Sequence, residues 1–288
     1  MITFENYLAK LPLLHTWDGG QTWNNGGFEP HLLRRLYAFL RDALPPSPFI
    51  LKTGAGNTTI TLAFLHPAHH TVVCPDTALL GRIERFCQDA GLSTDHLDVR
   101  PALSEWVLPE LAARTRDGAP PLHFGLIDGG HNWPIVFVDF CYVNFMLRQG
   151  GYLLIDDLQL HSVKELGRCL AEEPGFELAL DLGKSLVFRK TTEARQLGEW
   201  NESPYILRLS EENLRRPNPF ALEPAFSDQS VKPSTDSIIK RFVKVGSGIV
   251  RHAGELCVHL ASLISLVRSS AKFSSENHST RGAGKRDH

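Results

Sequence analysis

One strand–helix–strand pattern in the middle of the sequence constrains the fold more than any other feature. Two apolar runs, Phe124–Ile127 and Tyr152–Ile155, are separated by a helix-length segment and a Gly-Gly turn. Asp128 follows the first run, and Asp156 and Asp157 follow the second. Strands joined by such a crossover are normally parallel and close together. Because ligands of open parallel sheets bind outside the carboxyl ends of the strands, the three aspartates predict a site there.

The same alternation continues on both sides of this unit. Further strands are expected at 49–52, 71–74 and 97–99, and helices at 31–44, 58–65, 77–90, 104–114 and 164–171. Residues 176–180 and 185–189 flank the short segment 181–184 and predict a terminal antiparallel hairpin. Alternating strands and helices indicate an α/β fold with a mostly parallel sheet and helices on both faces.

The ends of the chain differ in composition from this α/β domain, which we assign to residues 31–192. Residues 1–30 are rich in Trp, Phe and Gly, as expected either for a lid over a site or for aromatic packing on the core. Five prolines between 201 and 233 predict an extended linker within 193–236. Apolar residues then recur at helical spacing over 237–268 and predict an amphipathic helix, and 269–288 have the composition of a disordered tail.

The charge is unevenly distributed. Residues 234–288 carry nine Lys/Arg and four Asp/Glu, a net +5, so the first 233 residues carry −7 of the total −2. The acidic body gives no general attraction to nucleic acid, and no nucleic-acid partner is expected. The helix at 237–268 could dock on its own domain, pair two chains in a homodimer, or lie on a membrane surface. A solvated helix with a disordered end is the simpler alternative.

The cysteines and the N-terminus bear on localisation. The five cysteines form no CxxC pair, and most fall in expected core segments, which is typical of reduced cysteines. The first ten residues lack the basic and apolar regions of a signal peptide, and no apolar stretch is long enough to span a membrane. A cytoplasmic protein is therefore expected.

A glycine-containing turn follows the first expected strand. Gly54 and Gly56 lie between that strand and the helix beginning at Thr58. Glycines let a ligand approach the backbone closely, and the free N–H groups of a helix N-terminus attract carboxylate or phosphate groups. No Gly-Lys-Ser/Thr follows, so this turn is not a nucleotide P-loop. Taken alone, it could equally be a plain tight turn.

Three motifs in order make a more specific pattern: GAGNTT at 54–59, IDGGH at 127–131 and GGYLLIDD at 150–157. Together they resemble class I S-adenosylmethionine-dependent methyltransferases. The most similar branch contains small-molecule O-methyltransferases, such as the catechol and macrocin enzymes. The resemblance covers residues 26–190. It implies a Rossmann-like seven-stranded sheet with an antiparallel last strand, and methyl transfer to a hydroxyl of a small molecule or glycoside.

The resemblance also implies roles for individual residues. Cofactor-binding positions would be Thr53, Gly54, Ala55, Gly56, Asn57, Thr58, Asp76 and Asp128. A divalent metal, Mg²⁺ or Mn²⁺, would be held by Asp128, Asp156 and Asp157, because hard carboxylate oxygens suit these ions. Such a metal would lower the pKa of the acceptor hydroxyl and position it for attack on the sulfonium methyl. The alternative is that these aspartates are ordinary strand-end or N-cap residues.

His131 is the candidate general base, with Asp128 beside it in the catalytic set. The catechol enzymes have a lysine three residues after the strand-end acid, and His131 occupies that offset from Asp128. Imidazole changes protonation near neutral pH and can take up a proton from a hydroxyl. A structural hydrogen bond is an equally good explanation for a loop histidine. His161 is a weaker candidate for the same opening.

Departures from the family pattern support a second hypothesis. The family usually has an acid where this chain has Lys52, and another acid, which binds the ribose, where it has Cys74; Asp76 is the possible substitute. A lysine beside a cationic ligand disfavours binding by about 1 kcal/mol or more. The alternative is therefore a catalytically degenerate methyltransferase fold that serves as a binding or assembly module. A metal-dependent hydrolase or hydroxylase on the same scaffold is a third possibility.

Overall fold

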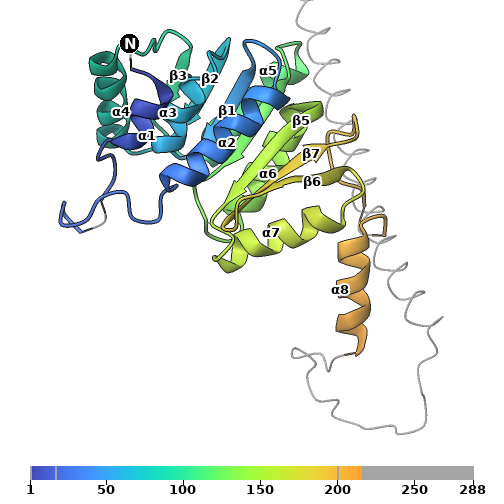
Figure 1. The fold of residues 1–288 in the computed structure, drawn as a ribbon. Helices are drawn as coiled ribbons and strands as arrows, with labels where there is room; N and C mark the ends of the chain where they lie inside the picture. Colours follow the sequence, from blue (N-terminus) through green and yellow to red (C-terminus); the bar gives the residue numbers. More distant parts are fainter. Residues whose placement is uncertain (1, 17, 200, 216–288) are drawn as a thin grey trace, which may run out of the picture. The chain divides into compact units, whose positions relative to one another are not determined.

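A seven-stranded sheet forms the centre of the computed structural model, which describes residues 2–16, 18–199 and 201–215 (Figure 1). The strands are β1 (Phe49–Thr53), β2 (His69–Val73), β3 (Leu97–Arg100), β4 (Leu122–Ile127), β5 (Leu147–Asp156), β6 (Phe176–Asp181) and β7 (Ser185–Lys190). Their spatial order is β3-β2-β1-β4-β5-β7-β6. All neighbours among β1 to β5 pair in parallel, and β7 pairs antiparallel with β5 and β6. The predicted Rossmann-like fold with an antiparallel last strand is confirmed.

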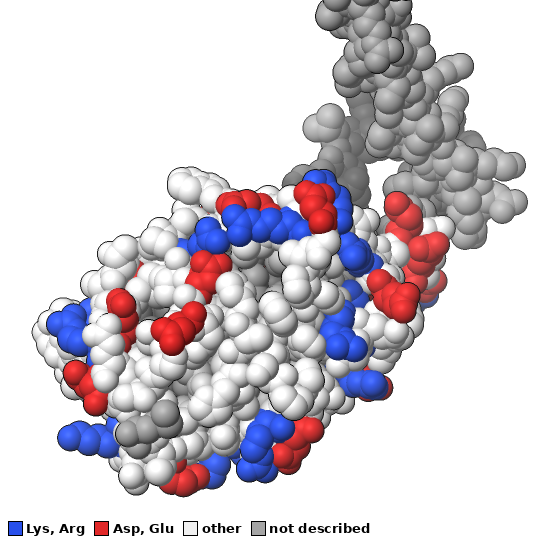
Figure 2. All heavy atoms as spheres, turned by 90° about the horizontal axis from the view of Figure 1, so that it is seen from above, with Lys and Arg blue, Asp and Glu red and all other residues white. Residues whose placement is uncertain are grey.

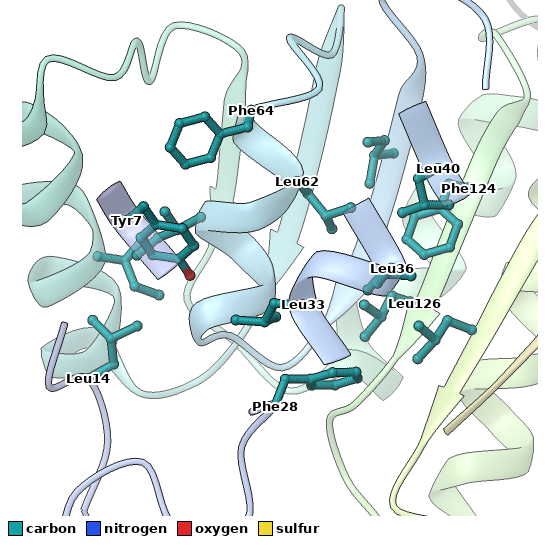
Figure 3. Close-up of a cluster of buried hydrophobic side chains, with 14 of the residues drawn as sticks. Tyr7, Leu14, Phe28, Leu33, Leu36, Leu40, Leu62, Phe64, Phe124 and Leu126 are labelled. Atoms are coloured by element: carbon teal, nitrogen blue, oxygen red, sulfur yellow. The ribbon is translucent and has the colours of Figure 1, made fainter. Parts of the chain in front are cut away.

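Helices cover both faces of the sheet. They are α1 (Phe4–Ala9), α2 (Pro30–Ala43), α3 (Asn57–Ala63), α4 (Thr77–Ala90), α5 (Ser104–Arg116), α6 (Ile135–Met146), α7 (His161–Glu172) and α8 (Pro204–Arg215). One buried cluster joins α1 to α4 to the sheet (Figure 3), and a second joins α5, α6 and α7 to it. Successive strand residues point to opposite faces, so Ile50 and Leu51 belong to different clusters. The inner strands β1 and β4 are buried on both sides because helices cover both faces there, whereas the edge strands β3 and β6 carry exposed residues.

The register of the strands sets the position of the site. Thr53 of β1 is paired with Ile127 of β4, and Ile127 is paired with Ile155 of β5. The residues that follow these strands therefore leave the sheet at one edge. The chain order reverses between β1 and β4, and such a reversal is where open α/β sheets bind ligands. Since β7 is antiparallel, its first residue, Ser185, lies at the same edge, opposite Asp156.

The first 30 residues pack on the core and also line the cavity at the carboxyl edge of the sheet. Tyr7 of α1 and Phe28 are buried in the first cluster (Figure 3), and the Tyr7 hydroxyl donates to the Asn57 carbonyl oxygen at 2.8 Å. His15 and residues 25–28 line the cavity at the carboxyl edge of the sheet. The N-terminal segment is thus anchored in the core and also covers the site.

The prediction of an extended linker is wrong for residues 204–215, which form α8. Pro204 stands at the first helical position, where a missing N–H costs nothing. The helix packs on α7: Tyr205 is buried and its hydroxyl donates to Glu165, and Arg208 pairs with Glu172. Residues 216–236 of the predicted linker, the predicted amphipathic helix at 237–268 and the tail at 269–288 lie outside the described residues. Within the described ranges, no helix has the length and apolar character needed to cross a membrane.

Charged side chains are mixed on the surface. On the face seen in Figure 2, Lys and Arg alternate with Asp and Glu around a broad uncharged area. The described residues visible on that face form no continuous basic band.

Candidate functional site

A cavity of about 630 Å³ lies at the carboxyl edge of the sheet. The loops after β1, β2, β4 and β5 form its walls, and residues of the N-terminal segment close one side. All cofactor-binding residues expected from the sequence line it: Thr53, Gly54, Ala55, Gly56, Asn57, Thr58, Asp76 and Asp128. His131, Asp156 and Asp157 line it as well. Its size is in the range of small-molecule sites, about 300–1,000 Å³.

The glycine turn approaches the neighbouring strand end very closely. Gly54 has φ +77°, and a Cβ added there would lie 1.8 Å from the Asp128 carbonyl oxygen. Its N–H donates to the Val73 carbonyl oxygen at 2.8 Å. Gly56 differs, because a Cβ there would have no neighbour within 4 Å. The turn is therefore packed on one side, and its backbone at Gly56 is open to a ligand on the other.

Lys52 lies beneath this turn and not in the cavity. Its side chain is fully buried on β1, and its ammonium donates to the Thr58 hydroxyl and lies 3.7 Å from Asp128 Oδ2. Burial lowers the pKa of Lys52, against the attraction of Asp128. The residue is absent from the cavity lining. Lys52 thus acts on a ligand through Thr58 and Asp128, which line the cavity, and not by direct contact.

Asp128 stands at the centre of the site. Burial raises its pKa to about 7; Lys52 opposes this shift, and Asp156 and Asp157 add to it. At this value the carboxyl group exists in both protonation states near neutral pH. Asp128 can therefore act as a hydrogen-bond acceptor or as a proton carrier.

His131 lies between two of the aspartates. Its Nε2 is 3.8 Å from Asp128 Oδ1 and 3.5 Å from Asp157 Oδ2, and it has no hydrogen-bond partner among the described residues. His131 also lines a second hollow, of about 510 Å³, together with Trp133 and Leu160. The imidazole thus stands where the two spaces meet. His161 is exposed and lines only the second hollow.

Asp156, the last residue of β5, and Asp157 are held by groups at the start of β7. One oxygen of Asp156 accepts from the Ser185 hydroxyl, and the other accepts from Lys184 Nζ at 3.1 Å. The same ammonium donates to Asp157 Oδ1 at 3.2 Å. Lys184 was not predicted from the sequence. The signal was present, however, because an antiparallel last strand must begin beside the end of β5.

Asp128, Asp156 and Asp157 do not fit a divalent ion as one ligand set, because both oxygens of Asp156 are engaged by Ser185 and Lys184. The atoms that come within 4.8 Å of one another belong to Asp128, His131 and Asp157. In that group, Asp157 Oδ1 already accepts from Lys184 and from Gln159. The carboxylates of this site are thus balanced by side chains of the chain itself.

The far end of the cavity lies at the carboxyl end of β2. One oxygen of Asp76 caps α4 by accepting from the Leu79 N–H at 2.9 Å, which leaves the other oxygen for a ligand. Cys74 is buried, and burial raises the pKa of its thiol. Asp76 is therefore the carboxylate that lines the cavity at the carboxyl end of β2.

No family model matches this chain, and no curated protein matches it. Several solved methyltransferase structures resemble it. An rRNA methylase from Streptococcus thermophilus has 17% identity, with 55% of this chain and 95% of that chain covered and a TM-score of 0.41. A putative caffeoyl-CoA O-methyltransferase from Staphylococcus aureus has 12% identity, with 56% of this chain and 82% of that chain covered and a TM-score of 0.46. The SAH-bound methyltransferase PaMTH1 from Podospora anserina has 11% identity, with 58% of this chain and 81% of that chain covered and a TM-score of 0.47. At such identities, the names of these proteins say nothing about the substrate of this chain.

Proposed function

We propose that this chain binds S-adenosylmethionine in the cavity at the carboxyl edge of the sheet and transfers its methyl group to a hydroxyl of a small molecule or glycoside. The observation that supports this best is the single cavity into which the Gly54–Thr58 turn, Asp76 and Asp128 all open. The open backbone at Gly56 suits the methionine part of the ligand, and Asp76 suits its ribose.

His131 is placed to act on the acceptor. It borders the cavity and also the hollow lined by Trp133 and Leu160, which offers an apolar surface for an acceptor. Its Nε2 is unpartnered among the described residues, so it can accept the proton of an acceptor hydroxyl. The nearby carboxylates of Asp128 and Asp157 would stabilise the resulting imidazolium. The bound methyl donor supplies an electrophilic methyl group, and the walls position the acceptor beside it.

Calorimetry with S-adenosylhomocysteine tests the proposal directly. A matched pair of glycine variants adds specificity, since an added Cβ at Gly56 and at Gly81 meets nothing within 4 Å, but only Gly56 lines this cavity. We expect Gly56→Leu to weaken binding about tenfold or more, by filling space that the ligand needs, and Gly81→Leu to leave it unchanged. Absence of binding at millimolar ligand would remove the proposal.

His131→Asn separates catalysis from binding. Transfer from methyl-labelled S-adenosylmethionine to a panel of phenols and glycosides should fall about 10²–10⁴-fold, while binding of S-adenosylhomocysteine persists. Equal turnover by both proteins would exclude His131 as the base.

The degenerate binding module stays the second candidate because of Lys52 and Cys74. It predicts no cofactor binding by the unmodified protein and a gain of binding in Lys52→Glu combined with Cys74→Asp. Micromolar binding by the unmodified protein would contradict this alternative.

A further inference from the structure

The ammonium of Lys184 fills the space between the carboxylates of Asp156 and Asp157 at the end of β5. Its Nζ donates to Asp156 Oδ2 at 3.1 Å, to Asp157 Oδ1 at 3.2 Å and to the Gly26 carbonyl oxygen at 2.6 Å. An ammonium group has three N–H donors, and each of them has an acceptor here. The Phe28 ring closes the remaining side, with its centroid 4.8 Å from Nζ.

The backbone fixes Lys184 in this place. Residue 184 precedes β7, which starts beside the end of β5, and the Leu158 N–H donates to the Lys184 carbonyl oxygen at 2.9 Å. Gly183 in the same turn has φ +83°, a conformation that favours glycine. The lysine is therefore held by the turn as well as by its own side chain.

A divalent ion bridging the same two carboxylates would need metal–oxygen distances of about 2.0–2.6 Å and would stand close to where Nζ stands. Two cations cannot share that space at such short range without strong repulsion. The ammonium also donates to the Gly26 carbonyl oxygen. A metal ion bound only to Asp156 and Asp157 would make no such contact with the N-terminal segment.

We infer that Lys184 is a resident cation that takes the place of a divalent metal beside Asp156 and Asp157 and fastens residues 26–28 over the cavity. The inference concerns the same cavity as the proposed methyl transfer but does not depend on which ligand the cavity binds. If methyl transfer is the activity, it proceeds without a divalent metal bridging Asp156 and Asp157.

Manganese alone is the probe, measured by electron paramagnetic resonance on the full chain. We expect no binding by the unmodified protein below about 1 mM. Lys184→Met frees the acid pair and removes a like charge, so it should bind Mn²⁺ about tenfold tighter or more. The matched control is Lys164→Met, since Lys164 is exposed on α7, and it should bind no better than the unmodified protein.

Two results would overturn the inference: micromolar Mn²⁺ binding by the unmodified protein that Asp157→Asn abolishes, or no gain of affinity in a folded Lys184→Met. If circular dichroism shows that Lys184→Met does not fold, the test uses the unmodified protein and Lys184→Arg, which keeps the positive charge. Micromolar binding by either contradicts the inference, and absence of binding by both supports it. Binding of S-adenosylhomocysteine is measured separately, so failure of the proposed function leaves the Mn²⁺ result standing.

The fastening role has its own readout in backbone amide exchange. In Lys184→Met, exchange at residues 24–28 should be about fivefold faster or more, because the contacts to Gly26 and Phe28 are lost. Lys164→Met should leave the same amides unchanged. Equal exchange in all three proteins would show that Lys184 does not hold this segment.

Discussion

Two lysines reach the same group of aspartates from opposite sides, and their surroundings affect them in opposite ways. Lys52, on β1, is fully buried, and burial lowers its pKa despite the attraction of Asp128. Lys184, before β7, keeps 22% of its side chain exposed. Burial lowers its pKa too, but the attraction of Asp156 and Asp157 outweighs burial and leaves the pKa above its ordinary value.

The number of acceptors explains the difference. The Lys184 ammonium has three hydrogen-bond acceptors, two of them carboxylates. The Lys52 ammonium has one hydroxyl acceptor and one carboxylate at the longer distance of 3.7 Å. A buried charge is stabilised only if its donors are satisfied and its partner is close. Lys52 is thus a weakly satisfied charge in the core, whereas Lys184 is a well-satisfied one at its rim.

The largest effect is expected from Lys52→Ala, which leaves the Asp128 carboxylate without its buried partner and opens a cavity. We expect the free energy of unfolding at pH 8 to fall by about 3–5 kcal/mol in urea titrations. Lys52→Met should lose less than half as much, because Met fills the space that Ala leaves empty. Asp128, whose pKa is about 7, loses its charged partner and can take up a proton in both variants. Equal losses in both variants would mean that the charge and not the packing of Lys52 is what stabilises the fold, because only Met keeps the packing.

Gly54→Ala tests how tightly the glycine turn above Lys52 is packed against the backbone of Asp128. The added Cβ would meet the Asp128 carbonyl oxygen at 1.8 Å in a conformation with φ +77°. We expect a loss of about 2–4 kcal/mol in urea unfolding, from strain and overpacking together. Gly56→Ala, whose Cβ meets no atom, should unfold like the unmodified protein. A fully stable Gly54→Ala would show that the turn can move away from Asp128.

The sequence was sufficient for the sheet because its signals are local. Apolar runs, glycine turns and helical spacing each lie within one segment, and β1, β4, β5 and the β6–β7 hairpin were found from them. The helix α8 was missed because prolines were counted without their position, and Pro204 occupies the first helical position, where proline is well tolerated. Position within an element therefore matters more than composition.

The balance of charges at the site could not be found from local signals. Asp128, Asp156 and Asp157 were predicted because each follows an apolar run, but the groups that neutralise them come from other elements. Lys52 seemed to face the ligand, whereas its side chain lies beneath the turn, because the direction of one side chain depends on the packing around it. Lys184 is 27 residues from Asp157 in the sequence, and only the antiparallel pairing of β7 brings them together.

His70, whose pKa is lowered in part by Lys52, makes the stability of the fold depend on pH. Its ring is fully buried on β2, with neither nitrogen hydrogen-bonded within the described ranges. Burial, and then Lys52, His96 and His69, lower its pKa well below the ordinary value. The unfolded chain therefore binds more protons below pH 6.5, so stability falls as the pH drops through that value.

Between pH 6.5 and 5, we expect the unmodified protein to lose about 1.5 kcal/mol more than His70→Phe in paired urea titrations. Since Phe keeps a ring of similar size and cannot be protonated, the difference between the two proteins isolates this one group. Parallel pH profiles would show that His70 is protonated as easily in the folded protein as in the unfolded chain.

Of the two lysines, Lys184 is expected to have the smaller effect, although its hydrogen bonds are better satisfied. Lys184→Ala leaves Asp156 bonded to Ser185 and Asp157 bonded to Gln159, and solvent can reach the space that opens. We expect a loss of about 1 kcal/mol, less than for Lys52→Ala although Lys184 makes more hydrogen bonds. Arg189→Ala, which removes an exposed pair with Glu177 at 2.8 Å, should leave the urea midpoint unchanged. The expected losses of stability thus decrease in the order Lys52, Lys184, Arg189, which follows the burial of the three side chains. The ion-pair distances alone would give the reverse order, and observing that reverse order would show that distance governs these pairs.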